Sequence, residues 1–349
     1  MTAVLGIDIG GSGSRIALKQ FLEGPGTRPE QVDSTDRFEL QGPRVQVSST
    51  GSSVSDLTTH LLETAAENWP DLWRDVVAVG VGATGVASLV TDPAALATHL
   101  GGEVGKPVAL ATDAVTAHLG ALGGEGGAVS VLGTGAIAVG HPGPDVEGVF
   151  TPQWRRVDGW GHLLGDRGGG AWVGRQGLTM ALRAHDGVES ASGSEALLAA
   201  AIRRFGSPEV WPGQFYTRDD RAGLLAEFAR DIVDLAGNGE PASVKLLTEA
   251  GREAARSGLA SLAQDCPPLL VLSGGLARAS AVLRAGFRAE VAEDGRGVSV
   301  RDSAGDPLDG ALALGQQASS GKIQPQEGMI WVWTPVRHCS PTPVAPQRF

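Results

Sequence analysis

Short apolar runs that end directly in glycine-rich turns recur along the chain and predict its principal strands. Residues 4–9 form the first run, and a strand-like pattern resumes at Ile16. Residues 128–132 and 136–139 repeat this arrangement around a second turn. Each unit predicts a β-hairpin, and its repetition is typical of a duplicated α/β fold. The turns that follow buried runs, including one after residues 269–272, are Gly10-Gly11-Ser12-Gly13-Ser14, Gly133-Thr134-Gly135 and Ser273-Gly274-Gly275.

Helical spacing of apolar residues alternates with these strands. The predicted helices cover residues 57–66, 96–100, most of 165–263, and 308–314, and further buried strands cover residues 76–81 and 108–110. Strands that alternate with helices indicate a largely parallel or mixed sheet with crossover helices. The fold class is therefore α/β.

The length of the chain favours two domains. It has 349 residues, of which 42% are hydrophobic. A chain of this length exceeds the usual size of a domain with a single hydrophobic core. We expect lobes of residues 1–115 and 116–320, with the last helix free to pack back on the first lobe. Residues 321–349 are rich in proline and carry the patch Ile330-Trp331-Val332-Trp333. Their composition favours a loosely held tail, the alternative being that the patch packs on the body or on a partner subunit.

The charge and cysteine content limit the partners and the compartment. A net charge of -11 repels nucleic acid and anionic membranes, so we expect neither as a partner. The two cysteines, Cys266 and Cys339, lie far apart and fit a reducing compartment, and no apolar stretch approaches the ~18 residues of a membrane span. The N-terminus does not resemble a signal peptide. We expect a cytoplasmic protein.

The glycine turns predict a nucleotide site. Glycine lets the backbone approach a bulky anion, and its N–H groups can donate to phosphate oxygens. A tight connection is the ordinary alternative for any one of these turns. Asp8, at the tip of the first strand, suits a Mg²⁺ ion held through water beside nucleotide phosphates, or else it is a turn aspartate. Residues 101–107 resemble a P-loop, but Pro107 replaces the magnesium-binding hydroxyl.

Five motifs in order give a family resemblance over about residues 3–316. They are the first turn with Asp8, Thr112-Asp113-Ala114, the second turn, Gly159-Trp160-Gly161-His162-Leu163-Leu164-Gly165-Asp166, and the third turn. This order resembles the BadF/BadG/BcrA/BcrD-type ATPase family, and within it the N-acetylglucosamine kinase branch. The resemblance implies the fold of the sugar kinase, chaperone ATPase and actin superfamily, in which two ribonuclease H-like lobes enclose an active-site cleft.

The resemblance also assigns roles to residues. Asp113 matches the catalytic aspartate that accepts a proton from the attacking sugar hydroxyl, and Asp8 matches the metal-associated carboxylate. Thr134, Trp160, Gly161 and Asp166 match positions at the sugar. The residues matched to ATP and its phosphates are Gly10, Gly11, Ser12, Ser14, Gly133, Thr134, Gly135, Gly274 and Gly275.

Several of these residues have a structural alternative. Asp113 lies between a strand and a helix, where an aspartate is a typical N-cap. Trp160 suits a sugar face, but a buried structural tryptophan is the ordinary alternative. His162 is expected to make structural hydrogen bonds, and Arg167 to pair with a neighbouring carboxylate. Many family members carry an asparagine after a Gly-Pro-like turn, whereas Gly42-Pro43 is followed here by Arg44-Val45-Gln46-Val47, which puts the identity of the sugar in doubt.

The resemblance leaves four classes of function. The first is a homodimeric kinase that uses ATP and Mg²⁺ to phosphorylate the 6-hydroxyl of an amino sugar, N-acetylglucosamine first, or another sugar such as glucosamine. The second is a BadF-type activator ATPase, which needs mid-chain cysteines that Cys266 and Cys339 do not supply. The third is a sugar-responsive regulator, for which the strand beginning at Ala3 leaves no room for a helix-turn-helix. The fourth is a nucleotide-binding module without catalysis.

Overall fold

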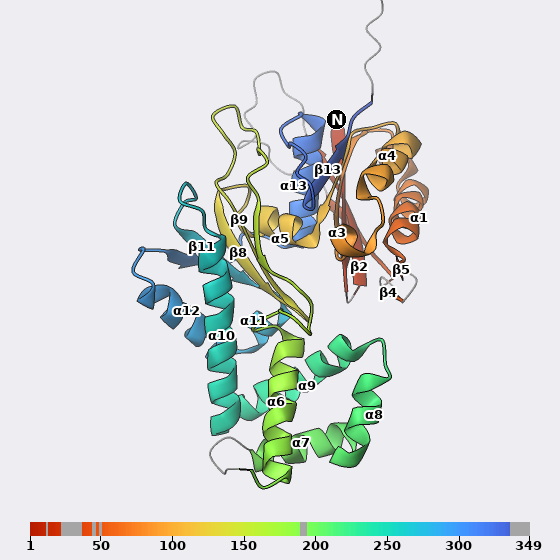
Figure 1. Cartoon of the computed structure of the whole chain (residues 1–349). Helices are drawn as coiled ribbons and strands as arrows, with labels where there is room; N and C mark the ends of the chain where they lie inside the picture. Colours follow the sequence, from red (N-terminus) through yellow and green to blue (C-terminus); the bar gives the residue numbers. More distant parts are fainter. Residues whose placement is uncertain (12, 22–36, 44–46, 49–50, 189–193, 336–349) are drawn as a thin grey trace, which may run out of the picture.

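The computed structural model contains two large β-sheets of matching design, joined by helices, and a small two-stranded sheet (Figure 1). It describes all residues except 12, 22–36, 44–46, 49–50, 189–193 and 336–349. The first sheet has the strand order β13-β7-β6-β1-β2-β3 and the second the order β10-β9-β8-β11-β12. The strands of the first are β1 (Thr2–Gly10), β2 (Gly13–Phe21), β3 (Arg37–Gly42), β6 (Val76–Ala83), β7 (Val108–Thr112) and β13 (Ile330–Trp333). Those of the second are β8 (Gly127–Leu132), β9 (Ala136–His141), β10 (Arg155–Asp158), β11 (Leu269–Ser273) and β12 (Ser299–Arg301), and β4 (Val47–Ser48) pairs with β5 (Gly51–Ser52).

The two sheets share one connectivity. β1 pairs antiparallel with β2 and parallel with β6, and β8 pairs antiparallel with β9 and parallel with β11. In each sheet a third antiparallel strand lies outside the hairpin and another parallel strand lies on the other side. Both predicted hairpins and the mixed character of the sheets are therefore confirmed, and the repeated unit in the sequence corresponds to a repeated topology.

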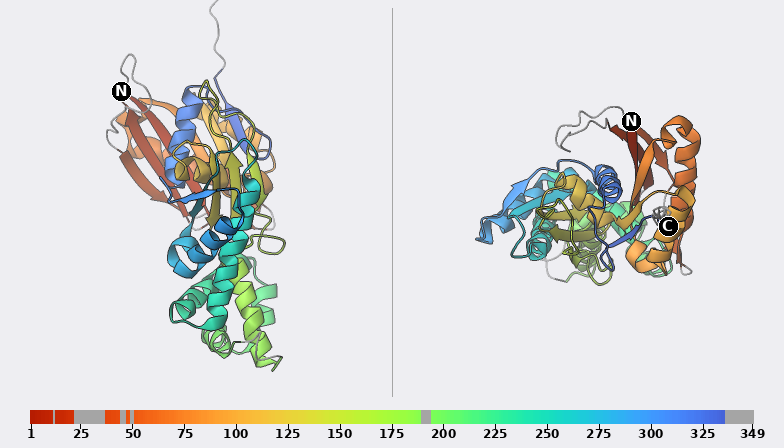
Figure 2. Two further views of the ribbon diagram at one scale, coloured as in Figure 1. Left: turned by 90° about the vertical axis from the view of Figure 1, so that its left-hand side faces the viewer. Right: turned by 90° about the horizontal axis from the view of Figure 1, so that it is seen from above.

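The helices fall into an inner and an outer set. Helices α5 and α13 lie between the two sheets, whereas α6 to α9 extend away from them (Figures 1 and 2). Helix α10 runs along the second sheet, where Ser130 Oγ donates to the carbonyl of Ala254. The helices are α1 (Val54–Asn68), α2 (Pro70–Trp73), α3 (Val86–Leu89), α4 (Pro93–Val104), α5 (Asp113–Ala121), α6 (Gly170–His185), α7 (Glu195–Phe205), α8 (Trp211–Tyr216), α9 (Arg221–Gly237), α10 (Pro241–Ser261), α11 (Gly275–Ala279), α12 (Ala281–Glu293) and α13 (Pro307–Ser319).

Helix α13 packs on the first sheet and on α5 at backbone distance. A Cβ atom at Gly80 of β6 would lie 2.1 Å from the carbonyl oxygen of Ala311 in α13. A Cβ atom at Gly310 of α13 would lie 1.7 Å from the carbonyl oxygen of Thr116 in α5. Only glycine permits contacts this close, so these positions fix how α5 is seated. The lobe boundaries at residues 115 and 320 stay a prediction.

The expectation of a loosely held tail was wrong for residues 322–335. Strand β13 pairs antiparallel with β7, and Met329 and Ile330 are buried. Trp333 lies over Gly101 of α4, where a Cβ atom would approach its ring to 2.1 Å. The apolar patch therefore forms the edge strand of the first sheet, which agrees with the alternative that it packs on the body. Burying it there removes apolar surface from water. The same contact places Gly101 inside α4, so residues 101–107 are no P-loop.

Among the helices of the described residues, none combines the length and the apolar character that crossing a bilayer requires.

Replacing Gly310 with alanine is expected to destabilise the protein strongly. The added methyl group has no room against the Thr116 carbonyl, so α5 and α13 must separate, at a cost of about 3 kcal/mol. Gly223→Ala in α9 is the matched control, because a Cβ atom there meets nothing within 4 Å and should raise stability by roughly 0.5 kcal/mol. Thermal unfolding of both variants measures the difference. Equal unfolding temperatures would contradict the close helix contact.

Candidate active site

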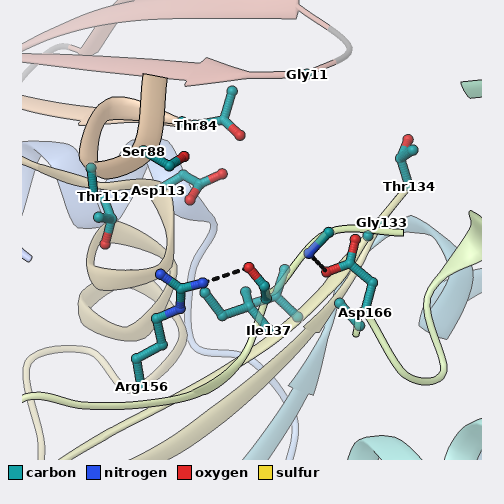
Figure 3. A pocket seen from close by; sticks show the side chains of 17 residues that line it. Gly11, Thr84, Ser88, Thr112, Asp113, Gly133, Thr134, Ile137, Arg156 and Asp166 are labelled. Carbon is teal, nitrogen blue, oxygen red and sulfur yellow. Dashed lines mark hydrogen bonds between the residues drawn. The ribbon is translucent and has the colours of Figure 1, made fainter. Parts of the chain in front are cut away.

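A pocket of about 490 Å³ opens between the two sheets. The first sheet and its helices contribute Gly11, Thr84 and Asp113, and the second contributes Gly133 and Thr134 (Figure 3). The carboxylates of Asp113 and Asp166 lie on opposite sides of the pocket in this view. The cleft thus brings together side chains that are far apart in the sequence. The predicted site residues that line it are Gly11, Asp113, Gly133, Thr134, Gly135, Gly161 and Asp166.

Asp113 begins helix α5 and is partly exposed to the pocket. The N-cap position belongs to Thr112, so Asp113 is not the cap residue itself, and its carboxylate also makes a hydrogen bond with the Ala114 backbone. Burial raises the pKa of Asp113 above its usual 3.8, and the negative charge of Asp8 adds to this. A hydrogen bond with the Thr84 side chain and the positive charge of Arg156 lower the same pKa. A carboxylate with a raised pKa at the floor of a cleft is suited to accepting a proton.

The turn Gly133-Thr134-Gly135 is held by its own carbonyl groups. The carbonyls of Gly133 and Thr134 accept hydrogen bonds from the amides of Gly170 and Ala171, at the start of α6. Gly133 and Thr134 are exposed in the pocket. A Cβ atom at Gly135 would lie 2.5 Å from the Asp166 carboxylate, so a side chain at this position would displace that carboxylate.

Asp166 lies in the 159–166 loop, which hydrogen bonds to Asp158 hold in place. Asp158 is 2% exposed and adopts the left-handed backbone conformation, with φ of 64°, which is uncommon for a residue other than glycine. Its carboxylate accepts hydrogen bonds from the amides of Asp166 (2.9 Å) and Arg167 (2.8 Å). Asp166 Oδ1 in turn accepts from the amide of Gly161 at 3.0 Å. The two carboxylates therefore fix the 159–166 loop against the pocket.

Three titratable residues in or next to this loop, Asp166, Arg167 and His162, differ in their partners. Burial raises the pKa of Asp166, against the lowering effect of the hydrogen bond from Gly161. Arg167 pairs with Asp158 at 3.5 Å and with Glu253 at 3.7 Å, as the sequence predicted for that arginine. The ring nitrogen Nε2 of His162 is buried and has no hydrogen-bond partner within the described residues, so the expected structural hydrogen bond is not made there.

Trp160 is not buried. Its side chain is 63% exposed, so the alternative of a buried structural tryptophan was wrong. The Arg156 guanidinium lies 4.7 Å from the centre of its ring, within the range of a cation–π contact. Trp160 does not line the pocket, although Arg156 does. Its predicted contact with a sugar stays a prediction.

Asp8 forms an ion pair with Arg15. Asp8 Oδ2 accepts from Arg15 at 2.8 Å, and Arg15 also pairs with Asp306 at 2.6 Å. Burial raises the pKa of Asp8, while the hydrogen bond from Arg15 lowers it. In the described part of the chain no group of three or more His, Cys, Asp or Glu side chains is arranged for a metal ion. Asp8 does not line the pocket. Mg²⁺ beside phosphates needs only one or two carboxylates plus water, so the role of Asp8 through water stays a prediction.

Gly10, Ser14, Gly274 and Gly275, which the sequence also predicted to bind the nucleotide, do not line the pocket. Gly10 ends β1, and Ser14 Oγ donates to the carbonyl of Pro43 at 2.7 Å. A Cβ atom at Gly274 would meet the Leu132 carbonyl at 2.2 Å, so the third turn adjoins the second. Gly275 begins α11. Ser12, Arg44 and Gln46 lie outside the described residues.

The pocket is also lined by Thr84, Ser88 and Arg156, which the sequence did not predict. Thr84 directly follows β6, which lies parallel to β7 with Ala83 opposite Thr112. The carboxyl ends of parallel strands meet at one edge, so the strand-end turn Thr84-Gly85 was a signal that could have found this residue. Arg156 lies within β10, and no local pattern sets it apart.

Residues 5–315 match the model of the BadF/BadG/BcrA/BcrD ATPase family. No curated protein matches the sequence. A structure from Chromobacterium violaceum, described as an inferred N-acetylglucosamine kinase, is 24% identical with a TM-score of 0.66 and covers 90% of this chain and 99% of its own. A second inferred N-acetylglucosamine kinase, from Porphyromonas gingivalis, is 18% identical with a TM-score of 0.62 and covers 92% of this chain and 100% of its own.

A ROK family glucokinase from Streptomyces griseus, in complex with glucose and AMPPNP, is 17% identical with a TM-score of 0.55. It covers 91% of this chain and 100% of its own. At these identities the similarity establishes the fold alone, and the predicted two-lobed, actin-like ATPase fold is confirmed.

Replacing Asp158 with asparagine is expected to loosen the 159–166 loop. An amide side chain can accept through one atom only, so either the buried amide of Asp166 or the partly buried amide of Arg167 loses its partner, at a cost of about 1–3 kcal/mol. Asp145→Asn is the matched control, because that carboxylate also accepts two amides but is exposed. Thermal unfolding and hydrogen exchange at Asp166 and Arg167 measure the effect. Equal behaviour of the two variants would contradict the role of Asp158.

Proposed function

Because this chain belongs to the BadF/BadG/BcrA/BcrD ATPase family, we propose that it is an ATP-dependent sugar kinase acting on the 6-hydroxyl of an amino sugar. The observation that carries the proposal is the pocket between the sheets, in which Asp113 faces the turn Gly133-Thr134-Gly135 and the Asp166 carboxylate. Phosphoryl transfer needs mostly alignment and charge neutralisation, and this pocket offers amides for phosphates and a carboxylate for the nucleophile.

In the proposed reaction Asp113 accepts the proton of the sugar 6-hydroxyl as that oxygen bonds to the γ-phosphorus and ADP leaves. Thr84 orients the Asp113 carboxylate by its hydrogen bond, and Arg156 favours the ionised form of that carboxylate. The turns Gly10-Gly11 and Gly133-Thr134-Gly135 hold the β- and γ-phosphates, and the third turn lies near the adenosine. Asp8 would hold Mg²⁺ through water, and the bound ion would neutralise negative charge on the phosphates.

The choice of an amino sugar rests on the 159–166 loop and on the inferred names of two similar structures. Asp166 is proposed to accept from sugar hydroxyls, with Gly161 and Trp160 shaping the site. The Asp166 carboxylate accepts hydrogen bonds from the amides of Gly161 and Ala136. An ionised carboxylate has about four acceptor positions, so capacity for a ligand remains. The cytoplasmic location and the homodimer are part of the same proposal.

Asp113→Asn is expected to lower turnover by roughly 10²-fold or more while nucleotide binding persists. Asparagine keeps the volume but cannot take the proton. Wild-type turnover should also fall as the pH drops through the raised pKa of Asp113, above 3.8, because a protonated carboxyl accepts no proton, and the variant should lack this acid limb. Steady-state rates against pH and calorimetric titration with AMPPNP measure the two effects.

Asp92→Asn is the control for Asp113, because Asp92 caps helix α4 through the Ala95 amide and is exposed. Asparagine caps as well as aspartate, so this variant should keep wild-type turnover. Near-wild-type turnover in Asp113→Asn would contradict its catalytic role. A wild-type protein that binds no nucleotide at millimolar concentration would contradict the kinase.

A coupled assay of ADP release across sugars is expected to show one clear preference. Buried polar groups left unpaired by a wrong ligand discriminate strongly, so N-acetylglucosamine should lead, glucosamine or another N-acetylated sugar should follow, and glucose should lie well behind. Equal rates with glucose and N-acetylglucosamine would contradict the amino-sugar preference. ATP hydrolysis that no sugar changes would favour the activator ATPase instead.

A further inference from the structure

A second pocket, of about 370 Å³, lies among helices α6, α8 and α9 beside the 159–166 loop. We call it the arginine pocket, and its defining residues are His162, Arg175, Leu178, Trp211, Phe215 and Arg221. The loop contributes Gly161 and Asp166 to the candidate active site and His162 to the arginine pocket. The two pockets are thus neighbours that share one loop.

Two polar atoms of the arginine pocket lack hydrogen-bond partners. Arg221 Nε and His162 Nε2 are buried, and neither makes a hydrogen bond within the described residues. In the same part of the chain, neither Arg175 nor Arg221 pairs with a carboxylate, and Arg175 reaches only the His162 carbonyl, at 3.3 Å. Burial and the charges of Arg221 and Arg175 lower the pKa of His162, which keeps the ring neutral near pH 7. In a chain with a net charge of -11, two arginines without a carboxylate on one pocket form a local excess of positive charge.

The rest of the wall is apolar and aromatic. Trp211 is 3% exposed and its Nε1 donates to the Gly206 carbonyl, which fixes the ring and leaves no free donor on it. Phe215 packs edge-on against Phe205, with ring centres 5.2 Å apart. Concave apolar walls with a few convergent polar groups are the usual design of a small-molecule site. Unpartnered donors of this kind cost free energy unless a ligand satisfies them.

We propose that the arginine pocket binds a small organic oxyanion with a ring or other apolar body. The oxyanion, a phosphate or a carboxylate, accepts hydrogen bonds from Arg175 and Arg221, and the body lies against Trp211 and Phe215. Guanidinium groups match the planar geometry of such anions and bind them with charge-assisted hydrogen bonds. The site is separate from the pocket of Asp113 and needs neither nucleotide nor sugar.

Calorimetric titration with phenyl phosphate and with phenylacetate tests the proposal on the full-length protein. At least one of them is expected to bind, whereas inorganic phosphate, which lacks the ring, and benzyl alcohol, which lacks the charge, are expected to bind at least tenfold more weakly. The better of the two aromatic anions identifies the oxyanion. Failure of both to bind at millimolar concentration would overturn the proposal, as would equal binding of benzyl alcohol.

Two substitutions, Arg221→Met and Arg175→Met, test whether the anion binds in the arginine pocket. Methionine keeps the apolar stem but removes the charge, so each variant is expected to lose about tenfold or more in affinity for the aromatic anion. Arg218→Met is the matched control, because Arg218 lies just before α9, is exposed and pairs with Asp220 outside the pocket. Equal losses in Arg218→Met and the two pocket variants would overturn the assignment, and thermal unfolding confirms that each variant is folded.

A competition experiment separates the two pockets. Saturating AMPPNP and N-acetylglucosamine are expected to leave the binding of the aromatic anion in place. Displacement of the anion by AMPPNP alone would overturn the proposal, because the anion would then occupy the phosphate turns. This readout requires no catalysis, so a protein that proves not to be a sugar kinase can still satisfy it.

Discussion

The close contact between helices α5 and α13 is the constraint on which the candidate site depends. At the crossing, Gly120 of α5 faces the Asp306 carbonyl and Gly310 of α13 faces the Thr116 carbonyl, with no space for a side chain at either glycine. Helix α13 also lies against β1 and β6 through Gly6 and Gly80. Because Asp113 is the first residue of α5, these contacts set where its carboxylate lies relative to the first sheet. Helix α5 contacts strands of the second sheet as well, so it links both walls of the cleft.

A chain of charges reinforces this arrangement. Arg15 on β2 bridges Asp8 on β1 and Asp306, and Asp306 caps α13 by accepting from the amides of Leu308 and Asp309. The groups are only partly buried, so solvent screens the pairs and their net contribution to stability is small. Their importance is geometric: the hairpin that carries the first glycine turn and the helix that seats α5 are joined through one guanidinium. The same guanidinium offsets the negative charge of Asp8 beside Asp113.

The 159–166 loop contributes residues to two pockets, the candidate active site and the arginine pocket. Asp158 and Asp166 use their carboxylates on backbone amides, and both residues adopt left-handed backbone conformations. Short polar side chains tolerate this conformation because they can hydrogen-bond nearby backbone groups. The result is a stiff loop whose two sides carry different chemistry, with an acidic side at the cleft and a histidine beside two arginines on the other side.

The sequence by itself determined the strands, the glycine turns and their order, because apolar runs and turn chemistry are local properties that adjacent residues express. It also supplied Asp113, Asp166 and the Gly133 turn, since each stands at the end of a strand or in a specific motif. The tertiary structure decided what depends on distant partners. Arg156 enters the cleft from the middle of β10, Asp8 is paired by Arg15 from the opposite strand, and the patch at residues 330–333 closes the edge of the first sheet. No local pattern contains these outcomes, because each arises only when elements remote in sequence pack together.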